Sequence, residues 1–86
     1  MTKEIDMLCW FDVEGTVTPI RFRLRDENSE PLILSVRRIV KRDLSKAAGN
    51  CVYIYHCEVI LQKRLQIVEL GYFVDENRWI LTRIFS

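Results

Sequence analysis

The most reactive side chains of this sequence are three cysteines and one histidine: Cys9, Cys51, Cys57 and His56. His56 and Cys57 are adjacent, and a cysteine nucleophile or a zinc site uses these two groups. In a β-strand, however, neighbours face opposite sides, so the pair cannot serve one ion or substrate without a bulge. Cys51 and Cys57 share a face but lie about 20 Å apart at roughly 3.3 Å per residue, too far for a disulfide. We therefore expect no metal ion and no cofactor, with the cysteines acting as small apolar side chains.

Other catalytic and ligand-binding patterns are incomplete as well. The only group that could orient His56 is Glu58, about 7 Å along the same strand face. Asp12 and Glu14 share a face, but two carboxylates fall short of the six or more oxygens of a calcium site. The three glycines stand alone, whereas phosphate-binding loops need glycine-rich turns. The sequence therefore predicts a protein that is not an enzyme.

A stripe of arginines is the most distinctive feature. Apolar and basic residues alternate along residues 20–25, which predicts a strand with one basic face. The arginines of that face are Arg21, Arg23 and Arg25. If Arg23 pairs opposite Ser35 on the next strand, Arg21 lies opposite Arg37, and Arg37 joins the same face. The candidate polyanion-binding residues are therefore Arg21, Arg23, Arg25 and Arg37.

Two readings of this basic face remain open. Like charges opposed across strands cost stability unless they are neutralised, and Asp12 or Glu14 could supply the counter-charge from within the chain. Alternatively the face binds an external polyanion, because guanidinium groups suit phosphate and small barrels bind single-stranded nucleic acid. The aromatic RNA-binding signature of the RRM family is absent, which weakens this second reading.

Length and composition further limit the classes of protein to which this chain can belong. Eighty-six residues make one small domain, 1–86, and 49% apolar residues with a net charge of +1 exclude disorder. Acidic side chains predominate in residues 1–20 and basic ones in residues 21–46. A secretory signal and an apolar run long enough to span a membrane are both absent, so we expect a cytoplasmic protein with reduced thiols.

The periodicity predicts a mainly β fold. Alternating or β-rich segments cover 5–13, 20–25, 32–41, 51–61, 65–74 and 78–85. Short polar turns join them, including residues 26–31 as the turn of a hairpin. About six strands in sequential order predict a small antiparallel meander that curls into a barrel or sandwich. Its aromatic side chains should fill the interior and leave little pocket volume.

One segment, 36–48, has two interpretations. Its β-branched first part favours strand to about Lys41, followed by a short helical turn over 43–48. The apolar spacing is also that of a helix, so a longer helix packed across the sheet is the alternative.

Scattered residues along nearly the whole chain add a resemblance. They are Leu8-Cys9-Trp10-Phe11-Asp12, Glu14-Gly15, Pro19, Arg21-Phe22-Arg23-Leu24, Ala48-Gly49-Asn50, Tyr55-His56-Cys57 and Arg78-Trp79. Their order resembles a family of short uncharacterised proteins of Gram-positive anaerobes. Because that family has no established activity, the resemblance implies a stand-alone cytosolic domain and transfers no site residue.

These observations together predict a non-enzymatic binding or interaction domain. Its expected partner is another protein or a second copy of itself, giving a homodimer, and not a membrane. The alternative is a single-stranded nucleic-acid-binding module that uses the arginine face. An exposed aromatic residue or an edge strand would favour association between proteins.

Overall fold

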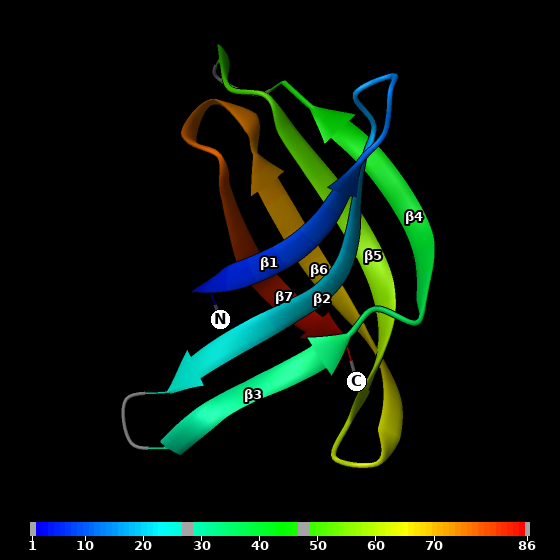
Figure 1. The fold of residues 1–86 in the computed structure, drawn as a ribbon, viewed down its shortest axis with the longest axis vertical. Coiled ribbons are helices and arrows are strands. Elements are labelled where there is room, and N and C mark those ends of the chain that lie inside the picture. The colour runs from blue at the N-terminus through cyan, green and yellow to red at the C-terminus, as the bar shows by residue number, and fades with distance from the viewer. Residues whose placement is uncertain (1, 27–28, 47–48, 86) are drawn as a thin grey trace.

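The fold is a single curled sheet of antiparallel strands. A computed structural model describes residues 2–26, 29–46 and 49–85. Its elements are β1 (Lys3–Phe11), β2 (Val17–Asp26), β3 (Ser29–Ser35), β4 (Arg38–Ser45), β5 (Val52–Leu61), β6 (Arg64–Phe73), the 3-10 turn η2 (Val74–Glu76) and β7 (Arg78–Phe85). Figure 1 shows these strands wrapping into a half-barrel. The mainly β, antiparallel class that the sequence predicts is confirmed.

The ends of the meander meet in space. The strand order is β3-β2-β1-β7-β6-β5-β4, and β1 pairs with β7 in antiparallel sense. The free edges of the sheet are therefore β3 and β4, in the middle of the sequence, and not the first and last strands. Curling places these two edges near one another and closes most of the wall around a core.

The two edge strands are halves of one bent strand, which the sequence reading took as a single strand over 32–41. Every other pair of consecutive strands is antiparallel, so the chain reverses at each of those connections. If it also reversed between β3 and β4, β1 and β7 would be parallel, but they are antiparallel. The chain therefore keeps its direction from β3 into β4. At the bend the Val36 N–H donates to Ile20 O of β2 at 2.8 Å, and the Arg37 N–H donates to Glu58 O of β5 at 2.7 Å. The chain thus changes partner strand within two residues.

The predicted pairing of Arg23 with Ser35 is wrong by two residues. Ser35 lies opposite Arg21, while Arg23 lies opposite Ile33. The predicted turn over 26–31 is too long, because β2 continues to Asp26 and β3 begins at Ser29. A shift of two keeps the side chains of β3 on their predicted face, but it leaves Arg37 beyond the end of the β2–β3 ladder, so Arg37 does not pair with Arg21.

The predicted helical turn over 43–48 is also wrong where the structure describes it. β4 continues to Ser45, and residues 47–48 of the predicted turn lie outside the described residues. Pairing of Asp43 with Ile54 and of Leu44 with Tyr53 holds this segment extended, against its helical apolar spacing. The same pairing excludes the longer helix.

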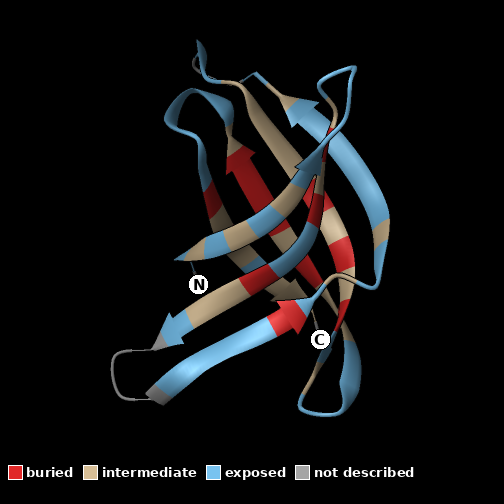
Figure 2. Ribbon diagram, in the orientation of Figure 1, coloured by how far each residue is buried: buried red, intermediate tan, exposed pale blue. Residues whose placement is uncertain are grey.

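The core sits against β5, β6 and β7, where buried residues concentrate in Figure 2. Burial alternates along β5, with Tyr55, Cys57 and Val59 fully inside. Trp79 of β7 packs on Tyr55 at 5.4 Å and stacks on Tyr72 at 4.8 Å between ring centroids. Phe22, Tyr55, Tyr72 and Trp79 fill the interior, but Trp10 and Phe11 are exposed, against the prediction for the aromatic side chains. The prediction of little pocket volume is also wrong, because a cleft opens between two strands of the wall.

Candidate binding site

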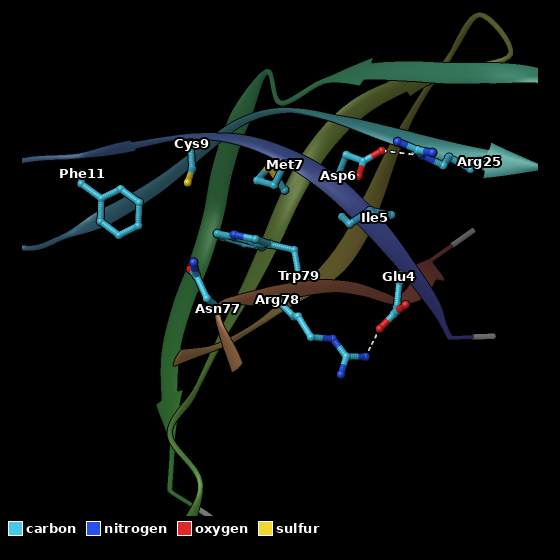
Figure 3. Close-up of a pocket in the computed structure, with 10 residues that line it drawn as sticks. All are labelled: Glu4, Ile5, Asp6, Met7, Cys9, Phe11, Arg25, Asn77, Arg78 and Trp79. Atoms are coloured by element: carbon cyan, nitrogen blue, oxygen red, sulfur yellow. Dashed lines mark hydrogen bonds and ion pairs between the residues drawn. The ribbon is translucent and has the colours of Figure 1, made fainter. Parts of the chain in front are cut away.

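A lateral cleft opens where β1 separates from β7. The two strands pair only along Lys3–Ile5 and Trp79–Leu81, and beyond Ile5 they diverge. The resulting cleft has a volume of about 990 Å³, within the range of ligand-binding pockets. Its lining is Glu4, Ile5, Asp6, Met7, Cys9, Phe11, Arg25, Asn77, Arg78 and Trp79, drawn in Figure 3.

The backbone edge of β1 faces this cleft without a partner strand. The Asp12 N–H donates to Thr16 O at 3.1 Å, so Asp12 faces the β2 side of the ladder. Backbone groups alternate between the two edges of a strand, which directs those of Met7, Cys9 and Phe11 toward the cleft. β7 offers these positions no pairing, because its ladder with β1 ends at Ile5.

The side chains at the same positions form apolar walls. Met7 and Cys9 are half-buried, and Phe11 is 57% exposed at the wide end of the cleft. Trp79 is buried between these residues and the core, and Figure 3 shows it across the opening from Met7 and Cys9. Burial raises the pKa of the Cys9 thiol, with a hydrogen bond from Trp79 acting in the opposite direction. Cys9 is therefore a protonated, apolar part of the lining and not a nucleophile.

The charges on the rim of the cleft are already paired. Arg78 forms ion pairs with Glu4 and, at 2.9 Å, with Glu76. Arg25 donates to Asp6 at 2.7 Å. The hydrogen bonds from Arg25 and Arg23 lower the pKa of the Asp6 carboxyl. A rim of paired charges around apolar walls suits an uncharged, apolar occupant.

The arginine face is neutralised from within the chain, by a residue that the sequence reading did not single out. Arg23 and Arg25 both donate to Asp6 Oδ2, at 2.9 and 2.7 Å. The register places Asp6 directly opposite Arg23, which is why it reaches both guanidinium groups. Arg21 makes no ion pair within the described residues, and Arg37 lies at the bend beside Glu58. The structure thus brings Arg21, Arg23 and Arg25 to one face, and within the described residues neither Arg21 nor Arg37 makes an ion pair.

The carboxylates expected to neutralise the arginines have another role in the β1–β2 turn. Asp12 Oδ1 accepts hydrogen bonds from the N–H groups of Glu14 and Thr16, each at 2.9 Å. Gly15 adopts a φ of +83°, a left-handed conformation that glycine tolerates best. Asp12 therefore shapes the turn, and Glu14 remains exposed beyond it.

His56 and Cys57 lie on opposite faces, as strand alternation predicts. Cys57 is fully buried, and burial raises the pKa of its thiol to about 12. His56 faces outward, where its Nε2 lies 2.8 Å from Glu69 Oε2. Thr82 Oγ1 donates to Glu69 Oε1 at 2.8 Å, and the hydrogen bonds from His56 and Thr82 lower the pKa of the Glu69 carboxyl.

The partner of His56 was not found from the sequence, which suggested only Glu58. Glu69 is brought opposite His56 by the β5–β6 hairpin register, while Glu58 pairs with Arg38 at 2.6 Å. The carboxylate of Glu69 lies in the middle of this hydrogen-bond chain, between the imidazole of His56 and the hydroxyl of Thr82. The cluster holds three adjacent strands together on their outer surface.

Residues 2–26, 29–46 and 49–85 contain no group of three or more His, Cys, Asp or Glu side chains that could hold a metal ion. No helix in this part of the chain is long and apolar enough to cross a membrane.

Comparison with known proteins returns no matching family model, no similar curated protein and no similar solved structure. The resemblance drawn from the sequence therefore stays a prediction. What the protein does has to be argued from its own surfaces.

Proposed function

We propose that the protein is a non-enzymatic interaction domain that binds an extended, apolar segment of a partner protein in the cleft between β1 and β7. One observation carries this proposal: an unpaired strand edge, with the backbone groups of Met7, Cys9 and Phe11, runs along one wall of a cleft that is lined by apolar side chains on its walls and by paired charges on its rim. Extended peptides bind such edges by adding a strand to the sheet.

Strand addition fits this cleft better than a small molecule does. The free backbone groups recur at every second residue, about 7 Å apart, the spacing at which another strand presents its own donors and acceptors. The side chains of Met7 and Cys9 are apolar and pack inward near Trp79, and the exposed ring of Phe11 continues this apolar row. A partner strand with apolar residues at alternate positions would satisfy the backbone groups and the apolar walls together.

A single-stranded nucleic acid on the arginine face is the competing proposal. Its support from geometry is smaller, because Asp6 accepts from both Arg23 and Arg25 and places a carboxylate where phosphates would lie. Arg37 lies at the bend, where its N–H donates to Glu58 O of β5 and where it has no partner residue on β2. What favours this alternative is the free guanidinium of Arg21 and an exposed Trp10 on the same face, a pair that can stack a base and bind a phosphate.

A displayed library of random nine-residue peptides, selected on the immobilised protein, tests the proposal. We expect enriched sequences with apolar residues at every second position. Their binding should weaken about fivefold in Cys9→Pro, which removes one backbone donor facing the cleft and worth about 1 kcal/mol. Titration of the synthetic peptide, followed by tryptophan fluorescence, gives the dissociation constants.

The matched control is Cys9→Ala, which keeps the backbone N–H and removes only the thiol. It should bind the selected peptide like the wild type, and circular dichroism should show that both variants are folded. Peptides without the alternating pattern, or equal binding by Cys9→Pro and Cys9→Ala, would contradict strand addition in this cleft.

A further inference from the structure

The space beside the cleft-facing edge of β1 lies on the line of β7, beyond the first residue of that strand. In the β1–β7 ladder Ile5 lies opposite Trp79. Antiparallel partners advance in opposite directions, so a longer ladder would bring Asn77 opposite Met7. The chain instead turns away at Asn77, which has a left-handed φ of 53° and donates its backbone N–H to Val74 O at 3.2 Å. A strand added to β1 in the cleft would therefore be collinear with β7 and would meet it end to end.

The narrow end of the cleft is thus closed to an extended chain. There β7 begins at Arg78 and pairs with β1 from Trp79 onward, so its backbone occupies the line of the added strand. At the wide end, beside Phe11, β7 has no residue opposite β1. A segment that adds to β1 can enter from the wide end but cannot continue past Arg78 within the sheet. This geometry favours a segment whose chain ends there.

The side chain of Asn77 presents a hydrogen-bond donor at the point where β7 begins. Its Oδ1 accepts from the Tyr72 hydroxyl at 2.9 Å, which orients the amide group. Its Nδ2 makes no hydrogen bond within the described residues, and the side chain belongs to the lining of the cleft. Figure 3 shows it on the wall opposite Cys9. An acceptor at the end of a bound segment would therefore meet an oriented N–H donor.

This donor distinguishes the two ends of a chain, whereas the rim charges do not. The rim charges are paired with one another, Arg78 with Glu4 and Arg25 with Asp6. A C-terminal carboxylate accepts hydrogen bonds, but an N-terminal ammonium group only donates them. The carboxylate can therefore bind Asn77 Nδ2, and the ammonium group cannot.

The direction of the strands agrees with a C-terminus at this point. A segment whose last residue lies at Asn77 runs in the direction of β7 and is antiparallel to β1. The strand pairs of the sheet are all antiparallel within the described residues. Antiparallel pairing is also slightly more stable per residue than parallel pairing.

We propose that the β1–β7 cleft binds the C-terminal end of a partner chain, as an extended strand antiparallel to β1 with its carboxylate at Asn77. This rests on the proposed function and adds which part of the partner is bound and in which direction. Residues directly opposite one another on paired strands share a face of the sheet. The partner residue opposite Met7 is therefore an apolar one that packs beside Trp79.

Two displayed libraries of nine-residue peptides, one with a free C-terminus and one with a free N-terminus, test the direction. We expect alternating apolar sequences to be enriched only from the library with a free C-terminus. A synthetic peptide of the enriched sequence should bind at least about tenfold more weakly when Gly-Ser-Gly-Ser extends its C-terminus, because β7 blocks the extension. The same extension at the N-terminus should leave the dissociation constant unchanged. A C-terminal amide should weaken binding about fivefold, since it removes the charge of the acceptor.

Asn77→Asp tests the donor. This variant keeps an oxygen that accepts from Tyr72 and a residue type that tolerates a left-handed φ, but it replaces the N–H donor with a second oxygen. The free-acid peptide should lose its advantage over the amide in this variant. Gln62→Glu is the matched control, because it makes the same exchange at an exposed turn position that also has a φ of 53°, away from the cleft. It should bind both peptides like the wild type, and circular dichroism checks that both variants are folded.

Three results would overturn this proposal while leaving strand addition in place, provided that the selected peptides still bind more weakly to Cys9→Pro than to Cys9→Ala. They are enrichment from the library with a free N-terminus, equal tolerance of the two extensions, and an unchanged preference of Asn77→Asp for the free acid. If neither library yields peptides that distinguish Cys9→Pro from Cys9→Ala, the proposed function fails and this inference fails with it.

Discussion

The two walls of the half-barrel differ in where their side chains go. In the wall of β5, β6 and β7, inward residues such as Leu70 and Leu81 are buried. Around Gly71 its outer surface is covered as well, because side chains of Phe73, Val52 and Ile54 lie within 4 Å of where a Cβ would stand, whereas Ile60 and Leu65 near the β5–β6 turn are exposed. In the wall of β1, β2 and β3, the described residues of β1 include none that is buried, and large apolar side chains project outward.

Within this small sheet, one wall contains most of the residues that stabilise the fold, and the other wall contains the surfaces available for binding. A wall whose inward side chains are fully buried contributes most of the hydrophobic stabilisation. A wall with exposed apolar residues and an unpaired strand edge leaves surface that association can bury. We infer that β5–β7 form the scaffold and that β1–β3 carry the interaction surfaces.

The largest expected effect compares one leucine from each wall. Leu70→Ala, at a fully buried position, should lower the free energy of unfolding by about 2–5 kcal/mol, because it removes buried methyl groups and leaves a cavity. Leu8→Ala is the matched change on the other wall and should cost less than about 0.5 kcal/mol in the monomer. Urea unfolding at low protein concentration measures both, and similar losses would contradict the division into scaffold and interaction wall.

A smaller effect concerns the link between the walls. The Tyr55 hydroxyl of β5 donates to Val17 O of β2 at 2.5 Å and accepts from Arg42 Nε at 3.3 Å. Tyr55→Phe removes this link and should lower the free energy of unfolding by about 1–1.5 kcal/mol in urea titrations. Tyr53→Phe is the control: its ring packs under Arg42 at 4.6 Å, and no hydrogen bond of its hydroxyl is found in the described residues. Equal losses in the two variants would mean that the hydroxyl does not hold the walls together.

The smallest effect lies on the outer surface of the scaffold wall. Hydrogen bonds from His56 and Thr82 lower the pKa of Glu69 in the folded protein, so they add stability that is present above the unfolded-state value of about 4.3 and lost as the pH falls through the folded-state value. Wild type should exceed Glu69→Gln in stability by up to about 1 kcal/mol at neutral pH, and the gap should close in acid.

Thermal unfolding of both proteins between neutral pH and about pH 3, near the acid limit of carboxylate titration, measures this gap. Thr82→Val keeps the contact between Glu69 and His56 and should show a smaller gap than Glu69→Gln. A gap that stays constant or widens toward acid would show that the outer cluster does not stabilise the scaffold wall through an ionised Glu69.

Most of the fold could be predicted from the sequence, because alternation with a period of two is a local signal. It indicated the strands and the faces of their side chains, including the opposite faces of His56 and Cys57. It could not indicate the bend at Val36 and Arg37, where the chain changes partner strand without a turn residue to mark it. It also could not fix the register of the β2–β3 hairpin, since a shift of two residues leaves the alternation unchanged.

The candidate site depended on pairing between distant strands. Asp6 reaches the arginines because β1 lies beside β2 in a particular register, and Glu69 reaches His56 through another. The cleft exists because β1 diverges from β7 after Ile5, and no local sequence pattern predicts this divergence. The local alternation of apolar and polar residues thus determined that this chain forms strands with two faces. Only the closing of the sheet decided which residues meet and which strand edge and aromatic ring stay uncovered. Those contacts join residues that are far apart in the chain.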